Sequence, residues 1–372
     1  MPENPRIPIH PLPYRPEFEQ SEPQERATED GLVSTLRSIS ETTLKDEGRA
    51  LRSVHAKSHA LLQGEMVVAS DLPPELAQGL FARAGRYPVI LRLSTIPGDV
   101  LDDDVSVPRG LAMKVIGVEG ERLPGSEDEA VQDFVLVNGP VFAAPSGKAF
   151  LSSLKLVAAT TDKAQFLKKA LSYTLRGIES AVEGVGGESA LLKQLGAHPA
   201  THPLGETYFS AAPILFGDYM AKVQLAPVIP ELTSLTDKPV KVFGHPYGLR
   251  EACNDFFAHH GGAWELRVQL CTDLETMPIE DASVEWSQDR SPYQTVATVT
   301  APRQIAWDEE KSHAIDDGQS FSPWHGLAAH RPLGSIMRLR KAAYRSSARF
   351  RSEHSGCPMH QPRSIEDVDL PA

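Results

Sequence analysis

The chain has 372 residues, of which 41% are hydrophobic and 23% charged, and this composition excludes a wholly disordered or fibrous protein. Its 49 acidic residues outnumber the 37 basic ones, so the net charge of −12 excludes nucleic acid as the default partner. Three cysteines are too few for a disulfide framework. With no apolar leader and no run of about 18 apolar residues, we expect a cytoplasmic protein without a membrane span.

The first segment, residues 1–30, is rich in Pro, Glu and Gln and poor in apolar residues, so it cannot fold alone. We expect an extended arm that is either disordered or draped over another surface, such as a second subunit. From Asp30 onward, apolar residues recur at helical spacing, which predicts one helix that ends before Val54.

Short β-branched runs follow, separated by Pro and Gly clusters, and they predict the strands of an antiparallel sheet or barrel. Residues 147–197 have helical periodicity and interrupt this sheet. The expected strands fall within 54–118 and after the acidic loop 119–129, and resume at 207–228, 238–244, 263–272 and 293–300. About eight strands result, which is enough to close a barrel.

The sequence has no phosphate loop, dinucleotide fingerprint, nucleophile elbow or paired CxxC. Instead, polar residues stand within apolar strands. His55 lies between Val54 and Ala56, and it is either a structural histidine or a functional one. Arg92 and Ser94 share one strand face, and an arginine facing the barrel interior would need an anionic partner, whereas one facing outward would not.

Two further segments carry candidate residues. Asn138 ends an apolar strand before Gly139 and Pro140, where it serves either as a plain turn residue or as a functional amide. On a basic helix, Arg340, Tyr344 and Arg351 share one face, which is either a solvated surface or a phenol flanked by positive charge. A phenol, with a pKa of about 10, ionises near neutral pH only beside a cation or metal.

Together these segments resemble the haem catalase family, over about four-fifths of the chain. In chain order, the matching segments are Arg52–Lys57 (R-x-x-H-A-K), Arg92–Thr95, Val107–Lys114, Asn138–Phe142, and Arg340 to Tyr344 (R-x-x-x-Y) with Arg351 beyond. Each fragment is weak alone, but five in the family's order are specific. Ser58 replaces the family's glycine after H-A-K, the Asn138 segment is one residue shorter, and the residues after Tyr344 differ from the usual D-T-Q.

The resemblance implies haem b as cofactor and hydrogen peroxide as substrate, with an organic electron donor as a further partner. Tyr344 would be the iron ligand, kept ionised by Arg340, and His55 would transfer the proton during peroxide cleavage. Asn138 would orient the peroxide and Ser94 would fix the imidazole tautomer. The cations for the haem propionates would be Arg52, Arg92 and Arg351, and Phe142 would pack over a haem edge.

The implied fold is an α+β, catalase-like closed antiparallel barrel of about eight strands with surrounding helices. We expect an arm over 1–30, a helix and barrel core with inserted helices over 31–305, a wrapping segment and proximal haem helix over 306–351, and a polar tail over 352–372. The long C-terminal helical region of full catalases is not expected, so the chain resembles the short catalase-related proteins. The arm is also a candidate contact for a homo-oligomer.

Two alternative functions stay open. The first is an enzyme of the same fold that metabolises organic or fatty-acid hydroperoxides, in whose allene-oxide-forming relatives a Thr commonly precedes the distal His; Val54 stands there in this chain. The second is a non-catalytic haem-binding protein, because Cys357 and Pro358 resemble a haem-regulatory dipeptide.

Overall fold

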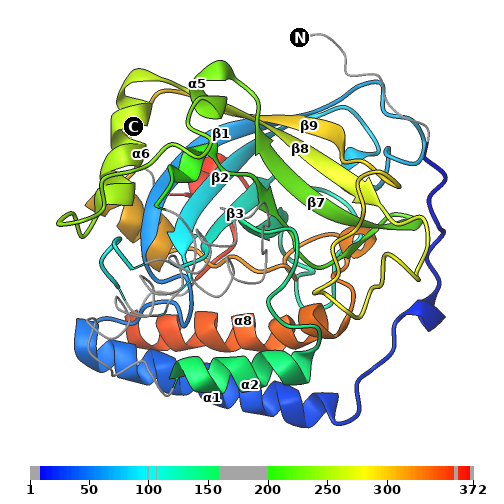
Figure 1. The fold of residues 1–372 in the computed structure, drawn as a ribbon, viewed down its shortest axis with the longest axis horizontal. Helices are drawn as coiled ribbons and strands as arrows, with labels where there is room; N and C mark the ends of the chain where they lie inside the picture. The colour runs from blue at the N-terminus through cyan, green and yellow to red at the C-terminus, as the bar shows by residue number, and fades with distance from the viewer. Residues whose placement is uncertain are drawn as a thin grey trace, which may run out of the picture.

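The structure is a computed structural model of the chain, and it describes residues 9–158, 200–355 and 359–368, apart from residues 97, 99 and 106. A twisted β-barrel stands above a layer of long helices (Figure 1). Among the described residues, we find no helix that combines the length and the apolar character needed to cross a membrane.

The barrel is one antiparallel sheet that closes on itself. The described strands, in chain order, are β1 (Ser58–Val68), β2 (Arg86–Thr95), β3 (Arg109–Ile116), β4 (Val131–Val137), β5 (Tyr208–Phe209), β6 (Ile214–Phe216), β7 (Tyr219–Pro227), β8 (Gly262–Leu270) and β9 (Gln294–Ala301). Their order is β5-β4-β3-β2-β1-β9-β8-β7-β6, and β5 also pairs with β7. The short β5 thus closes an eight-stranded ring with β6 outside it, which confirms the predicted closed antiparallel barrel.

The prediction of a strand at 238–244 is wrong. The only pairing in this segment, within the described residues, is an isolated bridge between Thr201 and Pro239. Pro239 lacks a backbone N–H, and Gly244 takes a left-handed conformation with a φ of 76°. The β-branched residues of the segment therefore lie in a loop that leads into helix α6.

Three helices form one group. Helices α1 (Glu25–Glu47), α2 (Gly147–Ala158) and α8 (Ser335–Ser355) pack against one another beneath the barrel through a separate apolar cluster (Figure 1). The predicted helix from Asp30 begins earlier, at Glu25, and ends at Glu47 because Gly48 is a left-handed C-cap with a φ of 70°. The helical periodicity expected at 159–197 lies outside the described residues.

Shorter helical segments connect these layers. They are α5 (Pro230–Thr233), α6 (Gly248–His259), α7 (Glu309–Lys311), the π-helical turn η5 (Ser312–Asp317), and the 3₁₀ turns η1 (Pro16–Phe18), η2 (Gly79–Phe81), η4 (Pro203–Gly205), η6 (Ala328–His330) and η7 (Ile365–Asp367). The π-helical turn differs from the others in that such turns commonly occur at functional sites.

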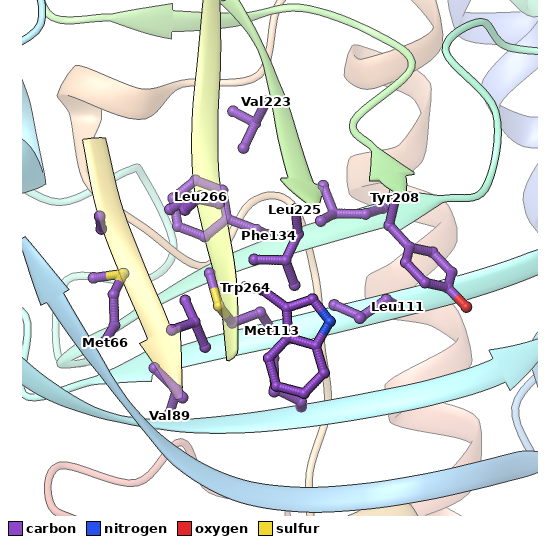
Figure 2. Packing of buried hydrophobic residues seen from close by; sticks show 14 of the residues in the cluster. Met66, Val89, Leu111, Met113, Phe134, Tyr208, Val223, Leu225, Trp264 and Leu266 are labelled. Carbon is purple, nitrogen blue, oxygen red and sulfur yellow. The ribbon is translucent and has the colours of Figure 1, made fainter. Parts of the chain in front are cut away.

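The barrel interior is the main hydrophobic core. Inward side chains from strands distant in sequence meet there, including Met66 of β1, Met113 of β3, Phe134 of β4 and Trp264 of β8 (Figure 2). Because side chains alternate between the two faces of a strand, polar residues of the same strands point to the outside of this core. The barrel is therefore a rigid, apolar support on which polar groups at strand ends are placed.

Residues 9–24 pack on their own chain. Their backbone runs along one side of the barrel, where Leu12 N donates to Cys271 O at 2.8 Å and Tyr14 N donates to Asp218 O at 2.8 Å (dark blue in Figure 1). Glu19 accepts hydrogen bonds from Arg331 and Arg338, so the segment is also tied to the start of α8 by ion pairs.

Candidate functional site

Three arginines from distant parts of the chain converge on Asp316 in the π-helical turn η5. Arg92 of β2 donates from Nε to Asp316 Oδ1 at 2.6 Å, and Arg52 donates from Nη1 to the same oxygen at 3.1 Å. Arg351 of α8 donates to the backbone oxygens of Asp316 and Gln319. The π-helical turn exposes carbonyl groups to the guanidiniums, so one short segment holds all three cations.

The charge of this cluster is incompletely balanced. Burial alone would raise the pKa of Asp316, but the charges of Arg92 and Arg52 hold this pKa at about 2. The carboxylate is therefore ionised at neutral pH. Burial and the charge of Arg92 lower the pKa of Arg351 to about 10, which leaves it charged as well. The carboxylates of Asp316 and the neighbouring Asp317 both act on Arg52 and Arg351, so three guanidiniums face two carboxylates. The Nε of buried Arg351 has no partner among the described residues.

Sequence reasoning missed Asp316, because nothing in the Ile-Asp-Asp-Gly segment distinguishes it from a surface turn. Its Oδ2 also accepts hydrogen bonds from Ser58 at 2.6 Å and Ser312 at 3.1 Å. Ser58 is the residue that departs from the catalase pattern. Here its hydroxyl joins the carboxylate to the indole Nε1 of Trp307, so the departure is built into the arginine cluster.

His55 and Ser94 come together beside this cluster. His55 Nδ1 lies 3.1 Å from Ser94 Oγ on β2, and the His55 backbone has a φ of 57°, fixed by a bond from its N–H to Ile96 O at 2.6 Å. A left-handed conformation at a non-glycine residue costs free energy and is typical of functional sites. On the other side, the imidazole packs against Gly110, where an added Cβ would lie 2.5 Å from His55 Cε1.

The His55 imidazole is neutral at physiological pH. Burial and then the charges of Arg92, Arg340 and Arg52 lower its pKa to about 3. When Nδ1–H donates to Ser94 Oγ, Nε2 is left with a lone pair that can accept a proton. Because Arg340 lies on α8, its effect on the pKa of His55 links the helix to the barrel side electrostatically.

Arg340 and Tyr344 form a pair on α8. Arg340 donates from Nη2 to the Tyr344 phenol oxygen at 2.7 Å, as residues four apart on one helix face can do. The ring of Tyr344 packs against the apolar cluster between α1, α2 and α8. The predicted pairing of a phenol with a guanidinium is therefore present in the structure, and Arg351 extends the same face toward the arginine cluster.

Two predicted residues are engaged elsewhere. Asn138 accepts from the backbone N–H of Arg109 at 2.9 Å and donates from Nδ2 to Glu206 at 2.9 Å. Phe142 meets Phe150 of α2 edge to face, with 5.1 Å between ring centres. These bonds tie Asn138 to Arg109 and Glu206 at the end of β4, and the ring contact ties Phe142 to α2.

Other residues noted in the sequence take structural positions. His59 is buried at a β-bulge of β1, with Nε2 3.3 Å from Thr95 Oγ1. Cys253 and Cys271 are buried free thiols whose pKa values burial raises. Cys357 and Pro358 lie outside the described residues. Within the described ranges, no group of three His, Cys, Asp or Glu side chains forms a metal site.

Comparisons with known proteins identify the fold. Solved structures similar to this chain include a fungal catalase (18% identity, TM-score 0.55), catalase A from Saccharomyces cerevisiae (17%, 0.56) and a bacterial catalase (16%, 0.56). The alignments cover 85%, 94% and 89% of this chain, but only 61%, 68% and 65% of those proteins. No family model matches the sequence, and no curated protein matches it. The likeness therefore establishes a catalase-like fold.

Proposed function

We propose that this chain is a haem-dependent oxidoreductase that cleaves peroxides. The observation that carries the proposal is the cluster of three arginines around Asp316, which is joined to His55 by a bond from Arg92 Nη2 to His55 O at 2.8 Å and to α8 by Arg351. Haem b has two propionates, and guanidiniums that outnumber the nearby carboxylates suit them. The catalase-like fold supports the same cofactor.

The residues divide into a holding group and a proton-transfer group. Arg52, Arg92 and Arg351 would bind the propionates, and the phenol oxygen of Tyr344 would ligate the iron, with Arg340 stabilising the phenolate. Bound haem iron supplies the redox chemistry that breaks the peroxide O–O bond. His55 is poised to take a proton at Nε2 from one peroxide oxygen and return it to the other.

Each partner of His55 has a defined part in this proton transfer. Ser94 holds Nδ1, which directs the lone pair of Nε2 to the substrate. Burial among the arginines keeps the imidazole neutral, and a protonated ring could not act as the base. We include Asn138 as a donor to peroxide and Phe142 as an apolar wall of the haem site.

The test is haem reconstitution of the full chain. Wild type should bind one ferric haem per chain, and Tyr344→Phe should lose the haem or shift its absorption spectrum. Tyr219→Phe, on strand β7 of the barrel, is the matched control and should keep both. Full haem content with an unchanged spectrum in Tyr344→Phe would contradict the ligand assignment.

Activity then separates the proposal from the alternatives. Oxygen release from hydrogen peroxide supports peroxide disproportionation. Turnover of an organic hydroperoxide without oxygen release would favour the hydroperoxide-metabolising enzyme. Haem binding without turnover of either substrate would leave a non-catalytic haem-binding protein.

A further inference from the structure

A second site lies on the other side of Tyr344. A pocket of about 900 Å³ opens between the acidic loop near Glu129, the segment Ser320–His325 and the face of α8 that carries Lys341 and Tyr344. This is the size of a small-molecule site. Tyr344 belongs both to this pocket and to the proposed haem site, and Phe321 links the pocket to the arginine cluster, because its ring centre lies 6.0 Å from Arg52 Cζ.

The pocket contains a histidine held by a buried carboxylate. The His325 side chain is 19% exposed, and its Nδ1 lies 3.1 Å from Asp133 Oδ2, to which it donates its hydrogen. Asp133 is fully buried and also binds Lys114 Nζ at 2.7 Å and the backbone N–H of Ser322 at 2.9 Å. With Nδ1–H committed to Asp133, His325 Nε2 remains as an acceptor in the pocket.

The charge of Asp133 supports this arrangement. Burial alone would raise the pKa of Asp133, but the charge of Lys114 and the hydrogen bond from His325 hold this pKa below its usual range. The carboxylate is therefore ionised at neutral pH and orients the imidazole. Glu129 lies at the same pocket, and its Oε2 is buried without a hydrogen-bond partner among the described residues. The pocket thus offers His325 Nε2 as an acceptor and has aromatic walls.

The walls suit a flat aromatic ring. Phe321, Trp324 and Tyr344 all line the pocket. Trp324 is fixed in place, because its indole Nε1 donates to Met337 O at 2.7 Å and Lys341 Nζ lies 4.6 Å from its ring centre. Rigid aromatic side chains bind rings with little loss of conformational entropy. A ligand that combines an aromatic ring with an O–H donor satisfies both the walls and the His325 acceptor.

We propose that this pocket binds a phenol that serves as electron donor, with His325 as the base that takes the phenolic proton. The inference rests on the proposed function, which supplies hydrogen peroxide as the oxidant. Each phenol loses one electron and one proton, and the peroxide gains two of each: H₂O₂ + 2 ArOH → 2 H₂O + 2 ArO•. Tyr344 lines the pocket and is the proposed iron ligand, so the donor would contact a residue that leads to the cofactor.

Binding tests the site without reference to activity. Calorimetric titration of the full-length, haem-loaded protein with guaiacol is compared with veratrole, which has a methoxy group in place of the phenolic O–H. We expect guaiacol to bind at least tenfold more tightly. His325→Gln should remove most of this preference, whereas His245→Gln, a change at an exposed histidine beside Glu251, should keep it. Equal binding of the two compounds by wild type would overturn the proposal.

Turnover supplies the second readout. In His325→Gln, the ratio of guaiacol oxidation to oxygen release should fall at least tenfold, as expected for loss of a general base. An unchanged ratio in a folded variant would overturn the proposed role of His325. The two hypotheses fail differently: the proposed function fails if wild type turns over no peroxide, and the phenol site fails if guaiacol binding is indifferent to the O–H group and to His325.

Discussion

The two halves of the candidate site are built in different ways. On the helix side, Arg340 and Tyr344 are four residues apart on α8 and bond to each other directly. On the barrel side, Arg92 bonds to Asp316, which is 224 residues away in sequence, and His55 is held in a left-handed conformation against Ser94 and Gly110. A helix face follows from local spacing, whereas the barrel side exists only when the whole fold is assembled.

The largest expected effect is on the residue that joins the two halves. Asp316→Asn leaves the guanidiniums of Arg52 and Arg92 without their carboxylate, so the free energy of unfolding should fall by about 3–5 kcal/mol. Urea denaturation measures this loss. The neighbouring Asp317→Asn is the control, because the Asp317 side chain is 29% exposed and pairs with His313, and it should cost less than about 1 kcal/mol. Equal losses would show that Asp316 does not join the halves.

A second prediction concerns the barrel side alone. In Gly110→Ala, the added carbon would lie 2.5 Å from Cε1 and 2.8 Å from Nδ1 of His55, so the imidazole must move away from Ser94. We expect peroxide cleavage to fall by ~10² or more, the scale of losing a general acid–base group. The matched reference is His55→Ala. The double variant Gly110→Ala/His55→Ala should cleave peroxide no more slowly than His55→Ala alone. Further loss in the double variant would mean that Gly110 acts elsewhere.

The third prediction is a pH dependence of stability. Because the folded-state pKa of His55 is lowered from 6.5 to about 3, the unfolded chain binds more protons than the folded one between these values. The contribution of His55 is therefore retained above pH 6.5 and declines as the pH falls toward 3. Between pH 6.5 and 5, wild type should lose roughly 2 kcal/mol more than His55→Gln. Parallel stability curves would contradict the buried, neutral imidazole.

The smallest effect is expected on the helix side. Arg340→Gln removes a half-buried pair formed within one helix, so the free energy of unfolding should change by less than about 1 kcal/mol. Urea denaturation and the helical content from circular dichroism measure it together. A loss as large as that of Asp316→Asn would mean that the helix side also depends on long-range packing, and the contrast between the halves would disappear.

The sequence by itself predicts the antiparallel strands and the pairing of Arg340 with Tyr344, and the resemblance to catalases adds the closed barrel. Strand patterns have a period of two and helix patterns a period of 3.6, so both are visible in short windows. The order of the motifs in the sequence also identified His55, Ser94 and the arginines Arg52, Arg92 and Arg351 as candidate residues. Their catalytic and cofactor roles remain predictions.

Only the tertiary structure decided which side chains meet. It brought Asp316 to the arginines, tied Asn138 to Arg109 and Glu206, and left 238–244 as a loop. These outcomes depend on contacts between residues far apart in sequence, and on competition among several partners for one polar group. Local periodicity carries no information about such contacts, because the same Asp or Asn is equally suited to a surface turn.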